Sequence, residues 1–196
     1  MPTVKNKTLN IGNFCVSLDR LLWSFEVWKK ESTDEIESAA KEFMQNDFQQ
    51  SKVIKFTSSV CTWGRIQRIY PNIIRLNNGT FPSETLAVAL RTAFHSLHDD
   101  IAIEAVISIP GLNISSASKH LRFIDPNRFA VLDSRYNETL GFSLNPAGYR
   151  FFLKELRLFA SNLREMKPKQ FSSLTLADIE NVLFFSVQPD SRKKYA

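Results

Sequence analysis

Apolar residues recur at helical spacing along most of this chain. Residues 18–29 place Leu18, Phe25 and Trp28 on one face of a helix. The same period predicts further helices in the first half of the chain, behind Thr33, over 47–59, from about Trp63, over 83–97 and up to Ile109. In the second half it predicts helices from the next turn to about Ile124, from Asp133 to Gly141, from Pro146 to Lys167, and over about 175–187. Strand patterns are scarce, and residues 1–17 read as an irregular arm. The pattern therefore predicts an all-α domain spanning residues 1–196, built as two helical lobes that meet at a cleft.

Two of these helices have apolar stripes that predict their buried faces. Ser83 is expected to cap a helix, with a buried stripe of Leu86, Leu90, Phe94 and Leu97. Pro146 opens the long helix, which carries Phe151, Phe152, Leu156, Phe159 and Leu163. We expect both stripes to pack into the core.

The turn at residues 109–117 separates two of the predicted helices. Gly111 supplies a backbone conformation with positive φ, and Asn113 tolerates the left-handed region better than other side chains. Ser115 and Ser116 then cap or open the next helix. Amides at such a turn and helix start converge on an anion, such as a DNA phosphate. The alternative is an ordinary corner between two helices, for which Pro and Gly are common.

Asp133 ends a short apolar run, Phe129–Leu132, and stands at the head of another predicted helix. A carboxylate in this position is a good helix N-cap. It is also a candidate catalytic group, and the two roles are compatible.

The composition narrows the classes of partner and compartment. The net charge is +5, which favours a polyanionic partner. Acidic residues gather in 31–47, so we expect that helix to face away from such a partner. No apolar run is long enough for a membrane span, and no secretory signal stands at the start. Cys15 and Cys61 could pair, but buried free thiols in a cytoplasmic protein are the simpler interpretation. His95, His98 and His120 make no zinc pattern with so few cysteines.

The segment 109–117 resembles the hairpin of the helix-hairpin-helix DNA glycosylase superfamily. The family hairpin reads Leu-Pro-Gly-Val-Gly-x-x-Thr-Ala, and this chain reads Ile-Pro-Gly-Leu-Asn-Ile-Ser-Ser-Ala from Ile109 to Ala117. Asn113 replaces the second glycine. The resemblance is specific over about 101–141, with the hairpin motif in about 101–124 and the aspartate segment in about 129–141. Weaker similarity at 61–65, 117–121 and 177–180 points to a bacterial branch described as 8-oxoguanine-glycosylase-like.

The resemblance implies roles for three residues. The family's catalytic aspartate lies about 18 residues beyond the lysine slot of the hairpin; here that slot is Ser115, and the aspartate is Asp133. A carboxylate there stabilises the positive charge that develops on deoxyribose during base release, and can activate water. Members that also cleave the strand use a lysine in the slot, so Ser115 implies release of the base without strand cleavage. Lys119, one helical turn further on, is a possible substitute amine.

The resemblance also implies DNA contacts. The hairpin residues Gly111, Leu112, Asn113, Ser115 and Ser116 would grip a phosphate, with Arg135 nearby. Trp63 and Arg65 are candidates for a base pocket or a wedge that fills the gap left by a flipped base. Arg68, Arg122 and Arg128 are further candidate phosphate contacts.

The resemblance implies a monomeric bacterial enzyme acting on double-stranded DNA in the cytoplasm. The base would be an 8-oxoguanine-like lesion, in DNA repair, or a hypermodified base such as glucosylated hydroxymethylcytosine, in defence against phage. No cofactor or metal is expected, apart from a monovalent cation at the hairpin carbonyls that the resemblance suggests; the cysteines of an iron–sulfur cluster are missing. The rival interpretations are a hairpin module that only binds DNA, a glycosylase with strand-cleaving activity through Lys119, and a helical scaffold with no nucleic-acid role.

Overall fold

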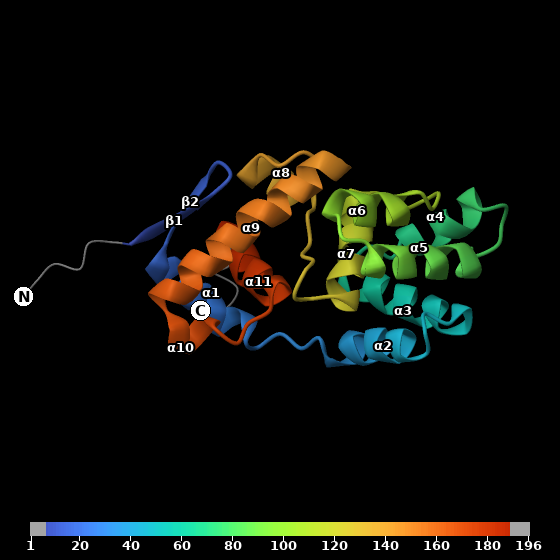
Figure 1. The fold of residues 1–196 in the computed structure, drawn as a ribbon, viewed down its shortest axis with the longest axis horizontal. Helices are drawn as coiled ribbons and strands as arrows, with labels where there is room; N and C mark the ends of the chain where they lie inside the picture. The colour runs from blue at the N-terminus through green and yellow to red at the C-terminus, as the bar shows by residue number, and fades with distance from the viewer. Residues whose placement is uncertain (1–6, 189–196) are drawn as a thin grey trace, which may run out of the picture.

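The computed structural model describes residues 7–188, and helices make up most of them (Figure 1). The prediction of a predominantly helical protein is confirmed. The basic sequence at 191–196, which is typical of a solvated chain end, lies outside the described residues.

A two-stranded antiparallel hairpin corrects the expectation of an irregular N-terminal arm. Strand β1 (Thr8–Ile11) pairs with β2 (Phe14–Ser17), with Leu9 opposite Val16. Leu9, Ile11 and Val16 alternate inward and are buried. Each strand has only four residues, which is too short for a period of two to stand out from a chain dominated by helices.

Five helices pack with this hairpin in one half of the structure, at the left in Figure 1. They are α1 (Leu18–Trp28), α8 (Ser134–Leu140), α9 (Pro146–Met166), α10 (Pro168–Phe171) and α11 (Leu176–Val187). Helix α1 lies along α11, and α9 lies against both β1 and α11. Four of the helices have side-chain N-caps, from Ser17, Asp133, Asn145 and Thr175.

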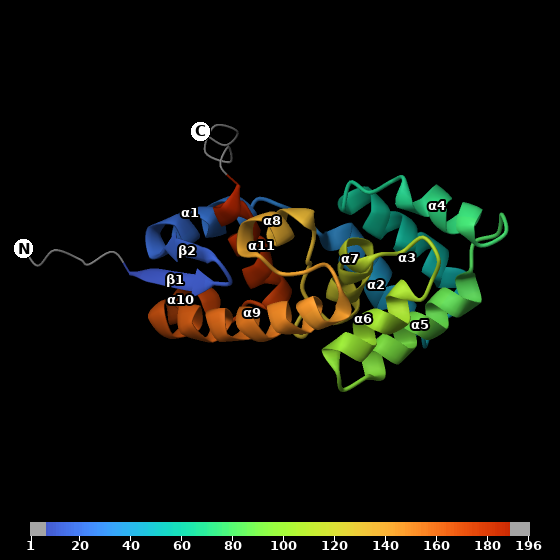
Figure 2. The same ribbon diagram turned by 90° about the horizontal axis from the view of Figure 1, so that it is seen from above.

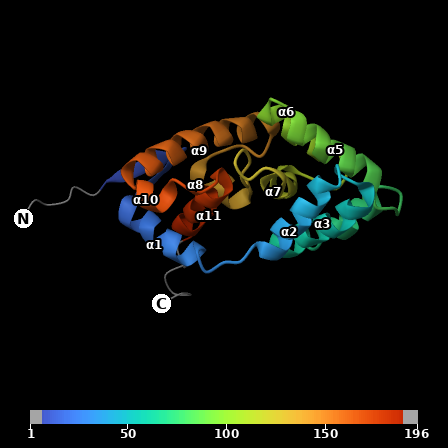
Figure 3. The same ribbon diagram turned by 60° about the horizontal axis from the view of Figure 1, so that its bottom comes forward.

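The other half holds the consecutive helices of the middle of the chain (Figure 2). They are α2 (Asp34–Gln45), α3 (Gln50–Trp63), α4 (Ile69–Leu76), α5 (Ser83–His95), α6 (Asp99–Ile107) and α7 (Ile114–Ile124). The chain returns to the first half through residues 125–133. Helices α5, α6 and α9 follow one another along one side of the molecule, and α6 packs against α9 (Figure 3).

Two predicted core positions are exposed. Leu97 is 93% exposed, because α5 ends at His95 and Leu97 lies in the connection to α6. Phe151 is 53% exposed, because α9 turns Phe152, Leu156 and Phe159 inward and leaves Phe151 at the edge of that face. The other positions of the two stripes are buried or half-buried. Ser83 is the first residue of α5 and makes no side-chain cap.

The turn between α6 and α7 depends on Gly111. Its φ is +100°, and a Cβ atom there would lie 2.9 Å from the Cα atom of Ile73 in α4. The Asn77 side chain also donates to the Pro110 carbonyl oxygen, at 3.0 Å. Gly111 is therefore required both by the backbone conformation and by close packing against α4.

Asn113 corrects a prediction about the same turn. Its φ is −128°, which is extended backbone, so it does not occupy the left-handed region. Instead it is the N-cap of α7: its Oδ1 accepts from the Ser116 amide, and Ser116 Oγ accepts from the Asn113 amide. This reciprocal capping box fixes where α7 begins.

The described cysteines are both free thiols. Cys61 is buried, as expected, and burial raises the pKa of its thiol to about 11. Cys15 is exposed, which corrects the expectation for that residue. Among residues 7–188, none of the helices combines the length and apolarity that a bilayer crossing requires.

Candidate active site

A pocket of about 470 Å³ brings together residues from five parts of the chain. This volume lies within the range of small-molecule sites, roughly 300–1,000 Å³. Its lining comes from the connection before α2, the end of α3, α7, the segment that leads into α8, and α11. The residues are Glu31, Thr33, Trp63, Gly64, Arg65, Lys119, Val131, Asp133, Arg135, Glu180, Asn181, Phe184, Phe185 and Gln188. Five of the predicted site residues, Trp63, Arg65, Lys119, Asp133 and Arg135, therefore line one pocket.

Asp133 is held at the pocket by its place at the start of α8. Its Oδ1 accepts hydrogen bonds from the amides of Arg135, at 3.1 Å, and Tyr136, at 3.3 Å. These bonds make Asp133 the N-cap of the helix and fix the direction of its carboxylate. The other oxygen, Oδ2, lies 3.8 Å from Lys119 Nζ. One carboxylate oxygen thus serves the helix and the other faces the lysine.

Lys119 reaches this carboxylate from α7. The residue is only 6% exposed, and its Nζ donates to Ser115 Oγ at 3.1 Å and to the Ser115 carbonyl oxygen at 3.4 Å. Burial lowers the pKa of the Lys119 amine, and the charges of Asp133 and Glu180 oppose that shift only in part. The amine therefore lies beside Ser115 and is easier to deprotonate than an exposed lysine.

Trp63 forms part of the aromatic wall of the pocket and is held by residues behind it. Its ring packs edge-on against Phe123, with centroids 4.9 Å apart, and the Arg122 guanidinium lies 4.7 Å from the Trp63 ring centroid. Arg122 is 3% exposed and donates to Asn181 Oδ1. Arg122 therefore supports the pocket from behind, which is a correction to its prediction as a phosphate contact.

Arg65 follows the end of α3 in a conformation that is unusual for its residue type. Its φ is +52°, in the left-handed region, and the next amide, of Ile66, donates back to the Cys61 carbonyl oxygen. This is the Schellman arrangement, in which glycine usually occupies the left-handed position. The exposed Arg65 and Arg135 both line the pocket on its solvent side, and the Arg135 guanidinium lies 5.9 Å from the Phe184 ring centroid.

Glu180 is a pocket residue that the sequence did not single out. It is 2% exposed, and its Oε2 accepts from the Val131 amide at 3.3 Å. Burial raises the pKa of the Glu180 carboxyl to about 7, although the positive charge of Arg122 opposes the shift. A signal was present: Glu180 is an acidic residue on the same helical face as the apolar Leu176 and Leu183. Its neighbours Asn181, Phe184 and Phe185 complete this wall.

The residues of the α6–α7 turn do not line the pocket. Leu112 is 8% exposed and Ser116 is 1% exposed, and the Ser116 hydroxyl is used in the capping box. Asn113 is exposed and Ser115 is half-buried beside Lys119. The amides of Ile114 and Ser115, at the first two positions of α7, lack intrahelical acceptors, as at every helix start. An anion at this turn would therefore be bound by backbone groups.

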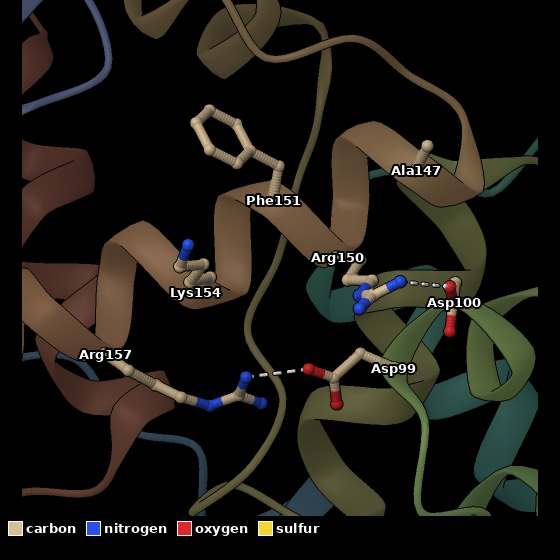
Figure 4. Close-up of a pocket in the computed structure, with 7 residues that line it drawn as sticks. All are labelled: Asp99, Asp100, Ala147, Arg150, Phe151, Lys154 and Arg157. Atoms are coloured by element: carbon tan, nitrogen blue, oxygen red, sulfur yellow. Dashed lines mark hydrogen bonds and ion pairs between the residues drawn. The ribbon is translucent and has the colours of Figure 1, made fainter.

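A second pocket lies between α6 and α9, on charged side chains that pair with one another (Figure 4). Arg157 donates to Asp99 at 2.7 Å, and Arg150 donates to Asp100 at 3.2 Å. Asp99 also accepts from Arg128 Nε at 3.1 Å, and a second Arg128 nitrogen bonds the Ser96 carbonyl oxygen. This network joins the two halves of the fold. Its use of Arg128 is a correction to the prediction of that residue as a phosphate contact.

Within residues 7–188, no group of three or more His, Cys, Asp or Glu side chains is arranged to hold a metal ion. Comparison of the chain with protein-family models, with curated proteins and with solved structures gave no match.

Proposed function

We propose that the protein is a DNA glycosylase of the helix-hairpin-helix type, which releases a damaged or modified base from double-stranded DNA. The observation that carries the proposal is the Asp133 carboxylate beside the Lys119 amine in a pocket with aromatic walls. In this proposal the halves of the fold are two lobes, the pocket is the cleft between them, and the α6–α7 turn is the DNA-binding hairpin.

The chemistry assigned to Asp133 is base release by water. As the bond between C1′ of the deoxyribose and the base breaks, its electron pair leaves with the base and positive charge develops on the sugar. The carboxylate stabilises that charge, and it can take the proton of the attacking water. The capping bonds to Oδ1 support this role, because they orient the carboxylate before substrate binds.

The DNA contacts assigned to the protein come from two places. The hairpin amides would bind a backbone phosphate at the start of α7. Arg65 and Arg135, which are exposed at the pocket, would bind phosphates or fill the space left by a flipped base. The protein would act as a monomer.

The pocket walls support binding of a base, and the resemblance supports two candidate substrates. Trp63, Phe184 and Phe185 offer surfaces on which a base can stack. Glu180 and Asn181 offer polar groups for its edge. An 8-oxoguanine-like lesion is favoured by the bacterial branch that the chain resembles. A hypermodified cytosine of phage DNA is the second substrate, which would make the enzyme part of antiviral defence.

The test is a panel of duplexes that each contain one lesion, together with phage DNA carrying modified cytosines. Released base is measured directly by mass spectrometry, and abasic sites are revealed by alkali. We expect release from at least one substrate by the wild type, and none by Asp133→Asn with duplex affinity retained. Wild-type binding to duplexes without release from any substrate would instead identify a DNA-binding module. Lack of any salt-sensitive DNA affinity would identify a helical scaffold.

One observation favours a second activity, strand cleavage. Lys119 Nζ lies 3.1 Å from the hydroxyl of Ser115, the slot where strand-cleaving members carry their lysine. A neutral Lys119 amine could attack C1′ as the base leaves with its electron pair. Cleavage of the C1′–O4′ bond, with a proton taken up by O4′, then gives an iminium ion, and loss of a C2′ proton expels the 3′ phosphate. Borohydride would trap this intermediate as a stable protein–DNA adduct. An adduct in the wild type that is missing in Lys119→Ala would establish the second activity. If the wild type forms no adduct, base release by water remains the proposed reaction.

A further inference from the structure

Gly64 occupies a position where the backbone does not require glycine. It is the C-cap of α3, with φ −73° and ψ −1°, a conformation open to any residue. The position that normally favours glycine is the next one, where φ is +52°, and there the chain has Arg65. Backbone conformation alone would favour glycine at position 65, whereas this helix end has its glycine at position 64.

Steric crowding around position 64 accounts for the glycine there. A Cβ atom at position 64 would lie 2.7 Å from Lys119 Cδ and 3.1 Å from Lys119 Cε. On the other side it would lie 3.1 Å from the Val60 carbonyl oxygen, which is backbone within α3. The aliphatic part of Lys119 therefore occupies the volume that any side chain at position 64 would take.

The packing of the Lys119 side chain against Gly64 also determines the position of the Lys119 amine. The Lys119 side chain is 8% exposed, and its Nζ is positioned between Ser115 Oγ and Asp133 Oδ2. A methyl group on residue 64 would push Cδ away from α3, and the open side available to it is the pocket. The amine would then leave its place beside Asp133.

We infer that Gly64 is a positioning residue, which holds the Lys119 amine beside Asp133 by leaving room for the lysine chain. The functional part of this inference rests on the proposed function, because it assumes that Lys119 and Asp133 act together. The structural part does not, and can be measured without DNA.

The first test follows the Lys119 amine itself. Trace acetylation across a range of pH, read by peptide mass spectrometry, gives the titration midpoint and reactivity of Lys119, with the exposed Lys41 as internal reference. In Gly64→Ala we expect the Lys119 midpoint to rise toward the ordinary lysine value of 10.5 and its labelling to increase. Thr62→Ala, at an exposed position in the last turn of α3, should leave the profile unchanged. An unchanged Lys119 profile in Gly64→Ala would overturn the inference.

The second test is a double-mutant cycle on thermal unfolding. Gly64→Ala should lower the unfolding midpoint in the wild-type chain and should not lower it in Lys119→Ala, where the close contacts with Lys119 Cδ and Cε are removed. An equal loss in both backgrounds would assign Gly64 to α3 packing and overturn the inference.

If the wild type releases a base, Gly64→Ala should slow single-turnover release by about a hundredfold, the cost of a displacement of about 1 Å in a catalytic group, with unchanged DNA affinity. An unchanged rate would overturn the functional part of the inference. Absence of release by the wild type would instead reject the proposed function, while the amine and unfolding measurements still decide the role of Gly64.

Discussion

The Nζ atom of Lys119 lies 3.8 Å from Oδ2 of Asp133, although the two residues come from different elements of the fold. Lys119 belongs to α7, and Asp133 caps α8. The pKa of the lysine is nonetheless lowered, because the cost of burying its charge exceeds the attraction of the nearby carboxylates. Burial of the charged Lys119 amine beside Asp133 therefore lowers the stability of the folded protein. Such costs are common at functional sites.

Replacing Lys119 with methionine should stabilise the protein at neutral pH. A pKa lowered in the folded state means that the charged amine is disfavoured by folding, so this cost is present at low pH and is relieved as pH rises toward 10.5. Lys119→Met removes the cost while keeping the volume. Thermal unfolding at pH 7 should show a higher midpoint, by about 2–4 °C for each ~1 kcal/mol. A lower midpoint would mean that the attraction to Asp133 outweighs burial.

Two substitutions at Asp133 should separate its capping role from the catalytic role proposed for it. Asn is also a good N-cap, so Asp133→Asn should keep the stability of the wild type and lose base release. Asp133→Ala should lose base release and also about 1 kcal/mol of unfolding free energy, as the cap is removed. Urea denaturation and the duplex panel give the two readouts. Retained base release in Asp133→Asn would rule out catalysis by the carboxylate.

Replacing Arg65 with glycine should make the protein more stable and a weaker DNA binder. The left-handed backbone costs a non-glycine residue about 1 kcal/mol, so the unfolding midpoint should rise by about 2–4 °C. Loss of the phosphate contact proposed for Arg65 should reduce the slope of log affinity against log salt by about 1. Arg68→Gly is the control: its φ is −64°, so glycine there should destabilise. Unchanged affinity in Arg65→Gly would remove Arg65 from the DNA interface.

Replacing Glu180 with glutamine should change how stability depends on pH. The pKa of Glu180 is raised from 4.5 to about 7 by burial, so its folded state binds more protons than the unfolded chain between these values. Stability from this group is present below pH 4.5 and is lost as pH rises through 7, by on the order of 3 kcal/mol. Glu180→Gln keeps an acceptor for the Val131 amide and should remove this loss of stability with rising pH. Denaturant unfolding of both proteins from pH 4 to 9 measures the pH dependence of stability. Equal profiles for the wild type and Glu180→Gln would contradict the raised pKa of Glu180.

The two aspartates at the start of α6 should differ in their effect on stability. Asp99 binds both Arg128 and Arg157 and its side chain is 12% exposed, so Asp99→Asn should cost about 1–3 kcal/mol. Asp100 pairs with Arg150, whose side chain is 66% exposed, so Asp100→Asn should cost less. Chemical denaturation of both variants compares them directly. Equal losses would mean that the Asp99 network does not join the two halves.

The local features of this chain could be predicted from its sequence. Helical spacing predicted most of the helices, and the single-residue signals at Gly111, Asp133 and Pro146 predicted where elements turn or begin. These features depend on interactions within a few residues, so the sequence carries them in full. The β-hairpin and the exposed Leu97 and Phe151 were missed, because a short strand or an edge position gives the same local pattern as other structures.

The tertiary structure decided which of these residues meet. Five of the predicted site residues line one pocket, whereas Arg122 is turned inward behind Trp63 and Arg128 is committed to the network of Asp99. Glu180 and Gly64 acquire their significance only from neighbours on other helices. Periodicity reports which face of a helix is buried. It does not report which charges from distant helices lie against each other, because that depends on how the helices pack.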